Sequence, residues 1–251
     1  IEGKLKFHIN QKKGLTNNTI LSLFEDKEHN LWLGLDNGIN CLNLNSFIKT
    51  FSDQTGILGT VYCSEIFDNK LYIGTNQGLF YKNLNQTEDF QFILGTKGQV
   101  WSLFKHQNTL FCGHDAGTFI INNNQAKKIY NQSGTWKFNV LPKNDNVLLQ
   151  GNYTGISILE KKNDSWVFKD KIKGFDYSSR FFEITNNLNI YVSHEYKGIF
   201  RIELNKDFSA VENLKTYSNP SKGKNSSLVK FRKDILYTNK NGVFKLDYTT
   251  K

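Results

Sequence analysis

An all-β fold of repeated antiparallel sheets is predicted by three observations on this sequence of 251 residues. Proline is scarce, at 2 residues, whereas glycine is plentiful, at 19, and aromatic residues make up 14% of the chain. Six short apolar runs are each followed by a polar turn and a closing glycine: Gly38, Gly78, Gly117, Gly155, Gly198 and Gly242. These glycines are 38 to 44 residues apart. Several strands per repeat at such a period indicate a β-propeller.

The first full repeat contains four short apolar segments that read as strands. They are Thr19 to Phe24, Leu31 to Gly34, Ile39 to Leu44 and, more weakly, Phe47 to Phe51. Polar turns separate them, and the Asn37-Gly38 pair suits a tight hairpin with positive φ. Four antiparallel strands in about 40 residues make one propeller blade.

The second strand of the repeat is apolar at consecutive positions, as in Leu31, Trp32 and Leu33. The same is true of 71–73, 110–112 and 190–192. A half-exposed strand would alternate, so consecutive apolar residues indicate a strand buried on both faces. We therefore expect each blade to be packed between two neighbours.

Later repeats follow the same order, and together they predict one domain over residues 1–251. The predicted first strands are 61–67, 100–105, 136–141, 180–185 and 228–232, and the predicted outer strands are 90–94, 127–130, 166–171 and 212–217. The six predicted blades cover approximately 14–51, 58–94, 97–130, 134–172, 176–217 and 225–251.

The segment 4–10, KLKFHIN, precedes the first repeat and resembles an outer strand. It would complete the sixth blade by pairing with the strand around Phe244 to Leu246, which closes a six-bladed ring and removes exposed edges. In the alternative, it finishes a preceding blade and the chain is part of a seven-bladed ring.

Charge and cysteine content favour neither a polyanion-binding protein nor a metalloprotein. The net charge is +9, but the lysines are scattered over all repeats, so a solvated basic surface is expected; the densest stretch is Lys222 to Lys224. Cys41, Cys63 and Cys112 lack metal-ligand spacing and are expected to be small buried thiols. We expect no metal and no cofactor.

Membrane and targeting segments are not found in the sequence. No apolar stretch approaches the roughly 18 residues of a membrane helix. Methionine is absent, even at position 1, so the chain is expected to be a fragment of a larger parent protein.

The segment 14–51 closely resembles the regulator-propeller repeat of bacterial two-component sensors. The residues that carry the resemblance are Gly14, Leu15, Asn17, Asn18, Asn30, Leu31, Trp32, Gly34, Asn37 and Gly38. The pattern is recognisable at 71–78 and decays from the third repeat, where Gly113 is followed by His114. Ser193 and Thr238 later replace the first glycine.

The resemblance implies the periplasmic sensor half of a membrane-spanning regulator from Bacteroidetes-like bacteria. Such regulators add a β-sandwich domain, one membrane helix and a cytoplasmic output, either a histidine kinase with a DNA-binding domain or a LuxR-type helix-turn-helix. The implied partners are a small molecule or oligosaccharide, the rest of the regulator and a second copy of it. The domain itself would contact no nucleic acid, and it would reach the membrane only through the parent.

Ligand-binding residues are expected at one mouth of the central channel, where loops from different blades converge. The loops before the first strands offer Tyr62, Gln99, Trp101, Trp136, Lys137, Tyr177 and Arg180, and the turns after the second strands offer His114, Tyr153, His194 and Tyr196. Aromatic rings beside amides and cations suit a sugar or an acidic sugar. In the alternative interpretation, the tryptophans fill the core between blades, Arg180 bonds loop carbonyls, and Asn17 and Asn18 cap a turn.

No catalytic residue is predicted. The pairs His114-Asp115 and His194-Glu195 are adjacent in sequence, and neighbouring residues of a strand point to opposite sides, so neither pair should form a direct dyad. The leading hypothesis is an extracytoplasmic sensor propeller without enzyme activity of its own. The alternatives are a propeller lyase or hydrolase acting on an anionic glycan, and a propeller that only binds proteins.

Overall fold

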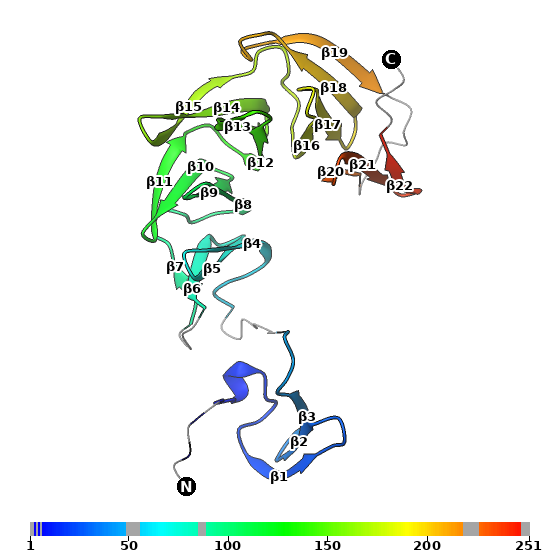
Figure 1. Cartoon of the computed structure of the whole chain (residues 1–251). Coiled ribbons are helices and arrows are strands. Elements are labelled where there is room, and N and C mark those ends of the chain that lie inside the picture. The colour runs from blue at the N-terminus through cyan, green and yellow to red at the C-terminus, as the bar shows by residue number, and fades with distance from the viewer. Residues whose placement is uncertain are drawn as a thin grey trace. The chain divides into compact units, whose positions relative to one another are not determined.

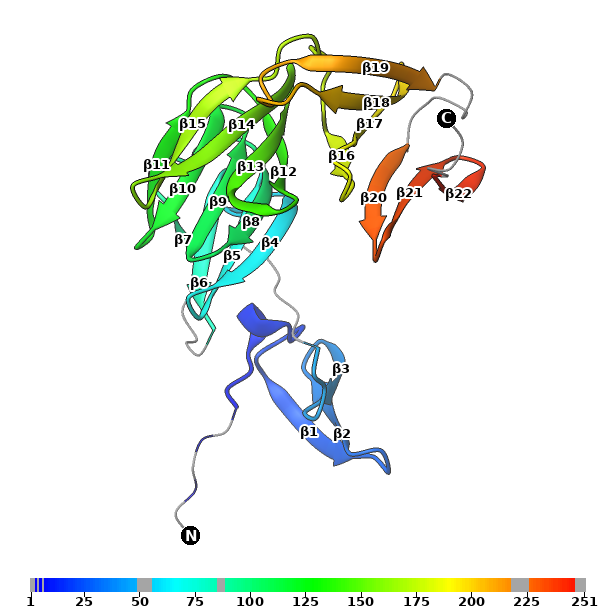
Figure 2. The same cartoon turned by 45° about the horizontal axis from the view of Figure 1, so that its top comes forward.

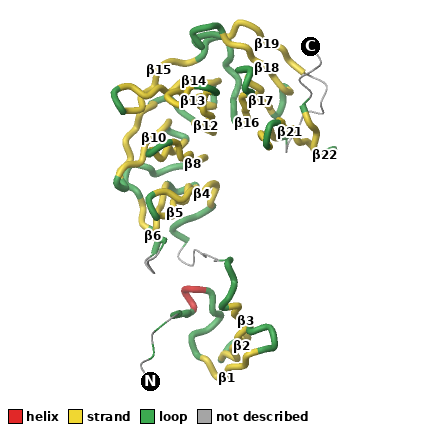
Figure 3. The backbone as a smooth tube through the Cα atoms, viewed as in Figure 1, coloured by secondary structure: helices red, strands yellow, loops and turns green. Residues whose placement is uncertain are grey.

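The computed structural model describes residues 3, 5, 7–48, 56–84, 89–217 and 226–246. Backbone contacts divide the chain into two compact units, Ile1–Ile57 (unit 1) and Leu58–Lys251 (unit 2). The described residues form six antiparallel sheets of three or four strands, and one short 3₁₀ helix (Figure 3). The predicted all-β propeller fold is confirmed.

Unit 1 holds the first sheet. Its elements are η1 (Gln11–Lys13), β1 (Ile20–Glu25), β2 (Asn30–Leu35) and β3 (Gly38–Asn43).

Unit 2 holds five sheets, which appear from cyan to red in Figure 1. Their strands are β4 (Val61–Phe67), β5 (Lys70–Thr75), β6 (Leu79–Asn83) and β7 (Gln91–Phe92); β8 (Val100–His106), β9 (Thr109–His114), β10 (Gly117–Asn122) and β11 (Gln125–Tyr130); β12 (Thr135–Leu141), β13 (Asn144–Asn152), β14 (Gly155–Lys162) and β15 (Ser165–Lys171); β16 (Phe181–Ile184), β17 (Ile190–His194), β18 (Gly198–Leu204) and β19 (Val211–Tyr217); β20 (Ser227–Phe231), β21 (Asp234–Asn239) and β22 (Gly242–Lys245).

Every sheet is a meander whose strands pair in chain order, as a propeller blade requires (Figure 2). In unit 2 the first strands β4, β8, β12, β16 and β20 contact one another in succession. The outer strands β11, β15 and β19 lie at the far edges of their sheets. Successive blades of unit 2 therefore stand side by side, with their first strands along one inner edge.

The six closing glycines all have positive φ, between +101° and +146°. At Gly117 a second constraint applies, because an added Cβ would lie 2.0 Å from the carbonyl oxygen of Tyr130. Gly117 thus serves both the turn into the third strand and the close approach of the outer strand.

The core of unit 2 lies between blades. One cluster joins the second and third sheets, another the third and fourth, another the fourth and fifth, and the last the fifth and sixth. The second strands 110–112 and 190–192 are buried throughout, which confirms the prediction from their consecutive apolar residues.

Within unit 1 taken by itself, Trp32 has an exposed fraction of 42%. Leu33 and Leu35 pack with Leu15 and form the buried cluster of this unit. Cys41 pairs with Trp32 across the sheet and is exposed as well, although a buried thiol was expected. Cys63 is half-buried and Cys112 is buried, as expected, and burial raises the pKa of Cys63 to about 12.

Two predicted edge strands differ from the structure. Leu5 and the segment 7–10 belong to no strand, and residues 4 and 6 lie outside the described residues. The predicted strand from Phe47 is absent at 47–48, and its remainder lies outside the described residues. The first and last sheets have three strands each within the described part of the chain. Closure of a six-bladed ring by 4–10, the seven-bladed alternative and a single domain over 1–251 stay predictions.

Candidate functional site: an aromatic row in unit 2

Three predicted aromatic residues occupy the same position at the start of successive first strands. Tyr62 in β4, Trp101 in β8 and Trp136 in β12 each fall where the pairing register with the second strand shifts by one residue. Such a β-bulge leaves one residue unpaired and redirects its side chain. The bulges thus present one aromatic side chain per blade at the same end of three neighbouring blades.

These side chains form a continuous row of rings with Tyr153, which lies in the turn between β13 and β14. The ring centroids of Tyr62 and Trp101 are 5.1 Å apart, and those of Trp101 and Trp136 are 4.7 Å apart. Tyr153 lies 4.8 Å from Trp136, and its hydroxyl accepts a hydrogen bond of 2.9 Å from the indole nitrogen of Trp101. We call Tyr62, Trp101, Trp136 and Tyr153 the aromatic row.

The aromatic row is partly accessible to solvent. Tyr62 is 43% exposed, and the two tryptophans and Tyr153 are of intermediate exposure. The tryptophans thus pack against each other between blades and also keep part of their surface exposed. Burial raises the pKa of Tyr153, so its hydroxyl stays protonated at neutral pH.

A cavity of about 510 Å³ continues from Trp136 toward the fifth blade. The guanidinium carbon of Arg180 lies 5.0 Å from the Trp136 ring centroid, and the Trp136 indole nitrogen donates to Ser178 Oγ over 3.1 Å. No carboxylate forms an ion pair with Arg180 among the described residues. His194, Glu195 and other side chains complete the lining, which includes Phe181, Ser193, Tyr196 and Ser226. The cavity thus combines a ring face, an unpaired cation and hydroxyl groups.

His194 is held in place by the turn after β17. Its Nδ1 accepts a hydrogen bond of 3.2 Å from the backbone nitrogen of Tyr196. Partial burial, followed by the charge of Lys197, lowers its pKa, so the ring is neutral at physiological pH. Tyr177 lies beside the His194 ring, at 5.9 Å, but stacks on Phe200 and is not part of the cavity wall.

His114 lies beneath the surface, with 1% of it exposed. Its Nε2 donates to the carbonyl oxygen of Thr96 over 3.2 Å, and its Nδ1 accepts from the backbone nitrogen of Ala116 over 2.9 Å. Burial lowers its pKa. The structure thus gives His114 an internal role in which no ring nitrogen faces a ligand.

The expectation that His114 and Asp115 form no direct dyad is not contradicted, since His114 Nδ1 accepts from Ala116 and Asp115 Oδ1 has no hydrogen-bond partner among the described residues. The two side chains nevertheless do not point apart as expected, because His114 Nδ1 lies 2.6 Å from Asp115 Oδ1. The reason is that His114 ends β9 and Asp115 begins the turn, where the alternation of a strand no longer holds.

Lys137 forms an ion pair between blades, and the backbone of Gln99 forms a hydrogen bond within its own blade. Lys137 Nζ lies 2.5 Å from Oε1 of the buried Glu183 in β16, and the same oxygen accepts the backbone N–H of Lys230 over 3.0 Å. The carbonyl oxygen of Gln99 accepts a hydrogen bond of 2.9 Å from the backbone nitrogen of Asp115. Glu183 in β16 therefore links β12 and β20 through one carboxylate oxygen.

Other residues singled out from the sequence have structural roles or lie outside the described residues. Asn17 Oδ1 accepts the backbone N–H of Thr19 over 2.7 Å, which is the predicted turn cap, and Asn18 Oδ1 accepts that of Gln11 over 2.7 Å. Lys222, Lys224 and Asn225 lie outside the described residues.

The sequence reasoning missed Ser178 and Ser226. Both are short polar residues in loops before first strands, and only their position in the repeat would have marked them.

The described residues contain no group of three or more His, Cys, Asp or Glu side chains placed to hold a metal ion. Within the same residues, no helix has the length and apolar character needed to cross a membrane.

Comparison with known proteins supports the resemblance seen in the first repeat. Residues 14–37 match the family model described as the two component regulator propeller, which confirms that resemblance. No curated protein matches the sequence.

Solved structures share the fold. The extracellular domain of the putative hybrid two component system BT4673 from B. thetaiotaomicron is 18% identical, with a TM-score of 0.61, over 94% of this chain and 36% of that chain. The corresponding domain of BT3049 from the same organism is 20% identical, with a TM-score of 0.51, over 96% of this chain and 35% of that chain. This chain thus spans about a third of the length of those domains. Virginiamycin B lyase from Staphylococcus aureus is 12% identical, with a TM-score of 0.55, over 91% of this chain and 84% of that chain.

Proposed function

We propose that this chain is a ligand-sensing propeller from the extracytoplasmic, periplasmic part of a membrane-bound bacterial regulator, and that its ligand is a carbohydrate with an acidic group. The observation that carries the ligand class is the aromatic row that runs into the cavity beside Arg180. Sugar rings stack on aromatic faces through their apolar C–H surfaces, and a guanidinium binds a carboxylate through two parallel hydrogen bonds. Ser178, Ser226 and Glu195 supply partners for sugar hydroxyls.

Two further observations support the signalling part of this proposal. The first repeat matches a family named for two-component regulators, and two structures of similar fold are extracellular domains of putative hybrid two component systems. In such a role, the domain passes the binding event to the rest of the regulator, which supplies the kinase activity and the dimer contacts that the resemblance implies.

Titration with acidic and neutral oligosaccharides, followed by calorimetry, tests the ligand class. Trp136→Ala should weaken binding about tenfold, which corresponds to roughly 1.4 kcal/mol for a stacked ring. The matched control is Trp32→Ala in unit 1, which should leave the affinity unchanged. Arg180→Gln should remove the preference for acidic over neutral sugars and leave stacking intact. If the Trp136→Ala variant and the unsubstituted chain bind the oligosaccharide with equal affinity, the proposed site is refuted.

The enzyme alternative rests on His194 and Glu195, which line the same cavity. A lyase or hydrolase acting on an anionic glycan would need one of them as a proton-transfer group. Incubating the chain with acidic polysaccharides and following chain length distinguishes the two functions. Cleavage that is abolished by His194→Ala would replace the sensor proposal with an enzyme, whereas binding without cleavage supports the sensor.

The third alternative is a propeller that binds only proteins, and a flat channel mouth would favour it. The polar-lined cavity of about 510 Å³ favours a small ligand over a flat protein interface.

A further inference from the structure

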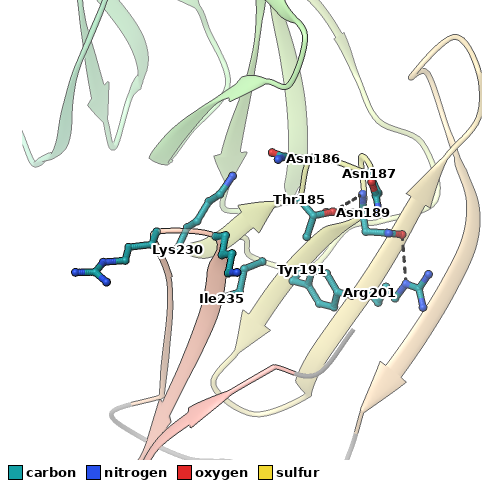
Figure 4. Close-up of a pocket in the computed structure, with 10 residues that line it drawn as sticks. Thr185, Asn186, Asn187, Asn189, Tyr191, Arg201, Lys230 and Ile235 are labelled. Carbon is teal, nitrogen blue, oxygen red and sulfur yellow. Dashed lines mark hydrogen bonds between the residues drawn. The ribbon is translucent and has the colours of Figure 1, made fainter. Parts of the chain in front are cut away.

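A second cavity, of about 500 Å³, lies between the fifth and sixth blades of unit 2 (Figure 4). It is formed by the turns that follow the first strands β16 and β20, whereas the aromatic row lies where first strands begin. The two cavities share no lining residue. This second cavity is therefore separate from the site of the proposed function.

The second cavity is lined by four cations: Arg201, Lys230, Arg232 and Lys233. We call it the basic cavity. Arg201 is neutralised, because its Nη2 lies 2.5 Å from Glu203 Oε1. The other three form no ion pair with a carboxylate in the described part of the chain. Lys230 Nζ donates to the carbonyl oxygen of Ile184 over 3.3 Å, and the guanidinium carbon of Arg232 lies 5.3 Å from the Phe231 ring centroid. Three cationic residues without a carboxylate partner thus line one cavity, which attracts anions.

The neighbouring turn supplies amide groups to the same cavity. Asn186 and Asn187 line it, and Asn189 Oδ1 accepts a hydrogen bond of 3.3 Å from Arg201 Nε, which holds the guanidinium at the wall (Figure 4). The two exposed amides offer both donors and acceptors to a bound molecule.

The turn that joins β20 to β21 carries two of the cations, Arg232 and Lys233, and Arg232 has a φ of +58°. Gln107 and Lys143 have positive φ in the equivalent turns of the third and fourth blades. The backbone of this turn is therefore shared with other blades, and what distinguishes it is that both of its residues are cationic and line the cavity.

We propose that the basic cavity binds an anionic oxyanion group carried by a small ligand, either a sulfate ester, which has one negative charge, or a phosphate ester, which has up to two. Lys230, Arg232 and Lys233 supply the charge, and Asn186 and Asn187 bond the uncharged part of the ligand. Guanidinium and ammonium groups form their strongest hydrogen bonds with such oxyanions.

Calorimetric titration of the whole chain with inorganic sulfate and with inorganic phosphate tests this proposal, at an ionic strength held constant with sodium chloride. The double variant Arg232→Asn, Lys233→Ser keeps a residue suited to positive φ and removes two charges. It should weaken binding at least tenfold, and Lys230→Gln alone should weaken it severalfold. The matched control, Lys127→Ala with Lys206→Ala, removes two exposed charges elsewhere and should change the affinity less than twofold.

Comparing the affinities for sulfate and for phosphate shows whether the ligand group is a sulfate ester or a phosphate ester. Tighter binding of sulfate assigns sulfate esters, tighter binding of phosphate assigns phosphate esters, and equal binding supports the shared oxyanion chemistry. No millimolar binding of either anion, or equal weakening in the cavity and control variants, overturns the proposal. Circular dichroism checks that each variant is folded. Trp136→Ala should leave anion affinity unchanged, so failure at the aromatic row and failure at the basic cavity can be told apart.

Discussion

The bulged aromatics depend on glycines in the paired second strands. An added Cβ at Gly113 would lie 2.6 Å from the carbonyl oxygen of Thr135, and one at Gly151 would lie 2.1 Å from that of Ser179. Both carbonyls belong to the next blade, so these glycines let neighbouring blades approach closely. That approach brings Trp101 and Trp136 within stacking distance.

Gly117→Ala should destabilise unit 2 by about 2–4 kcal/mol, because it combines a φ of +129° with a backbone clash at Tyr130. Gly95→Ala is the matched control, since Gly95 has a φ of +85° and no heavy atom within 4 Å of an added Cβ. It should cost about 1 kcal/mol. Urea unfolding measures both, and equal losses would show that the close approach does not matter.

Asp26 should make unit 1 sensitive to acid. The indole N–H of Trp32, bonded to Asp26 Oδ2 over 2.9 Å, and then the amides of Asn30, lower the pKa of Asp26 to about 2. A carboxyl whose pKa is lowered by folding stabilises the fold above its unfolded value near 3.8. That contribution is lost as the pH falls from about 4 through 2.

An NMR titration of the Asp26 carboxyl checks this prediction. Trp32→Phe should raise its pKa toward the unfolded value, because the largest stabilising hydrogen bond is removed. Trp101→Phe is the control and should leave the pKa of Asp26 unchanged. An unchanged pKa in Trp32→Phe would contradict the assignment of the cause.

At the scale of the element, the blade is not a stable unit by itself. Phe182 in β16 is fully buried in a cluster that also contains Leu149 and Ile156 of the fourth sheet. Each sheet of unit 2 thus buries its apolar faces against its neighbours, as in other repeat architectures. Loss of one contact should weaken two blades at once.

Phe182→Ala should lower the free energy of unfolding by about 3–5 kcal/mol, because it opens a cavity between the fourth and fifth sheets. Phe231→Ala, at a position that is 56% exposed, is the control and should cost less than about 1 kcal/mol. Chemical denaturation measures both. A small loss in Phe182→Ala would mean that this cluster does not hold the blades together.

At the scale of the whole molecule, the two units differ in the cores that they contain. The cluster of unit 1 has three buried residues, Leu15, Leu33 and Leu35, whereas unit 2 contains four clusters that span five sheets. Local stability follows the amount of buried apolar contact.

Backbone amides of β2 should therefore exchange with solvent faster than those of β13. Hydrogen exchange followed by mass spectrometry compares the two strands in one sample. Comparable protection of β2 and β13 would mean that unit 1 is stabilised by more than its own cluster.

Much of the fold could be predicted from the sequence because strand, turn and repeat are local properties. The apolar runs, the turn glycines and the period near 40 residues fixed the blades, and the predicted strand 61–67 is the observed β4. The predicted edge strands have no counterpart at the described residues 5, 7–10 and 47–48, because a fourth strand depends on a partner edge and not on its own sequence.

The candidate site was only partly accessible to such reasoning. The sequence by itself determined which aromatic and charged residues start each blade, since that follows from the repeat. Only the tertiary structure decided that Trp101 and Trp136 stack in one row, that His114 is buried, and that Lys137 forms an ion pair with Glu183. It also brought Arg232 and Lys233 to the basic cavity. The physical reason is that these contacts join different blades, whose distances are set by packing between sheets and leave no local mark in the sequence.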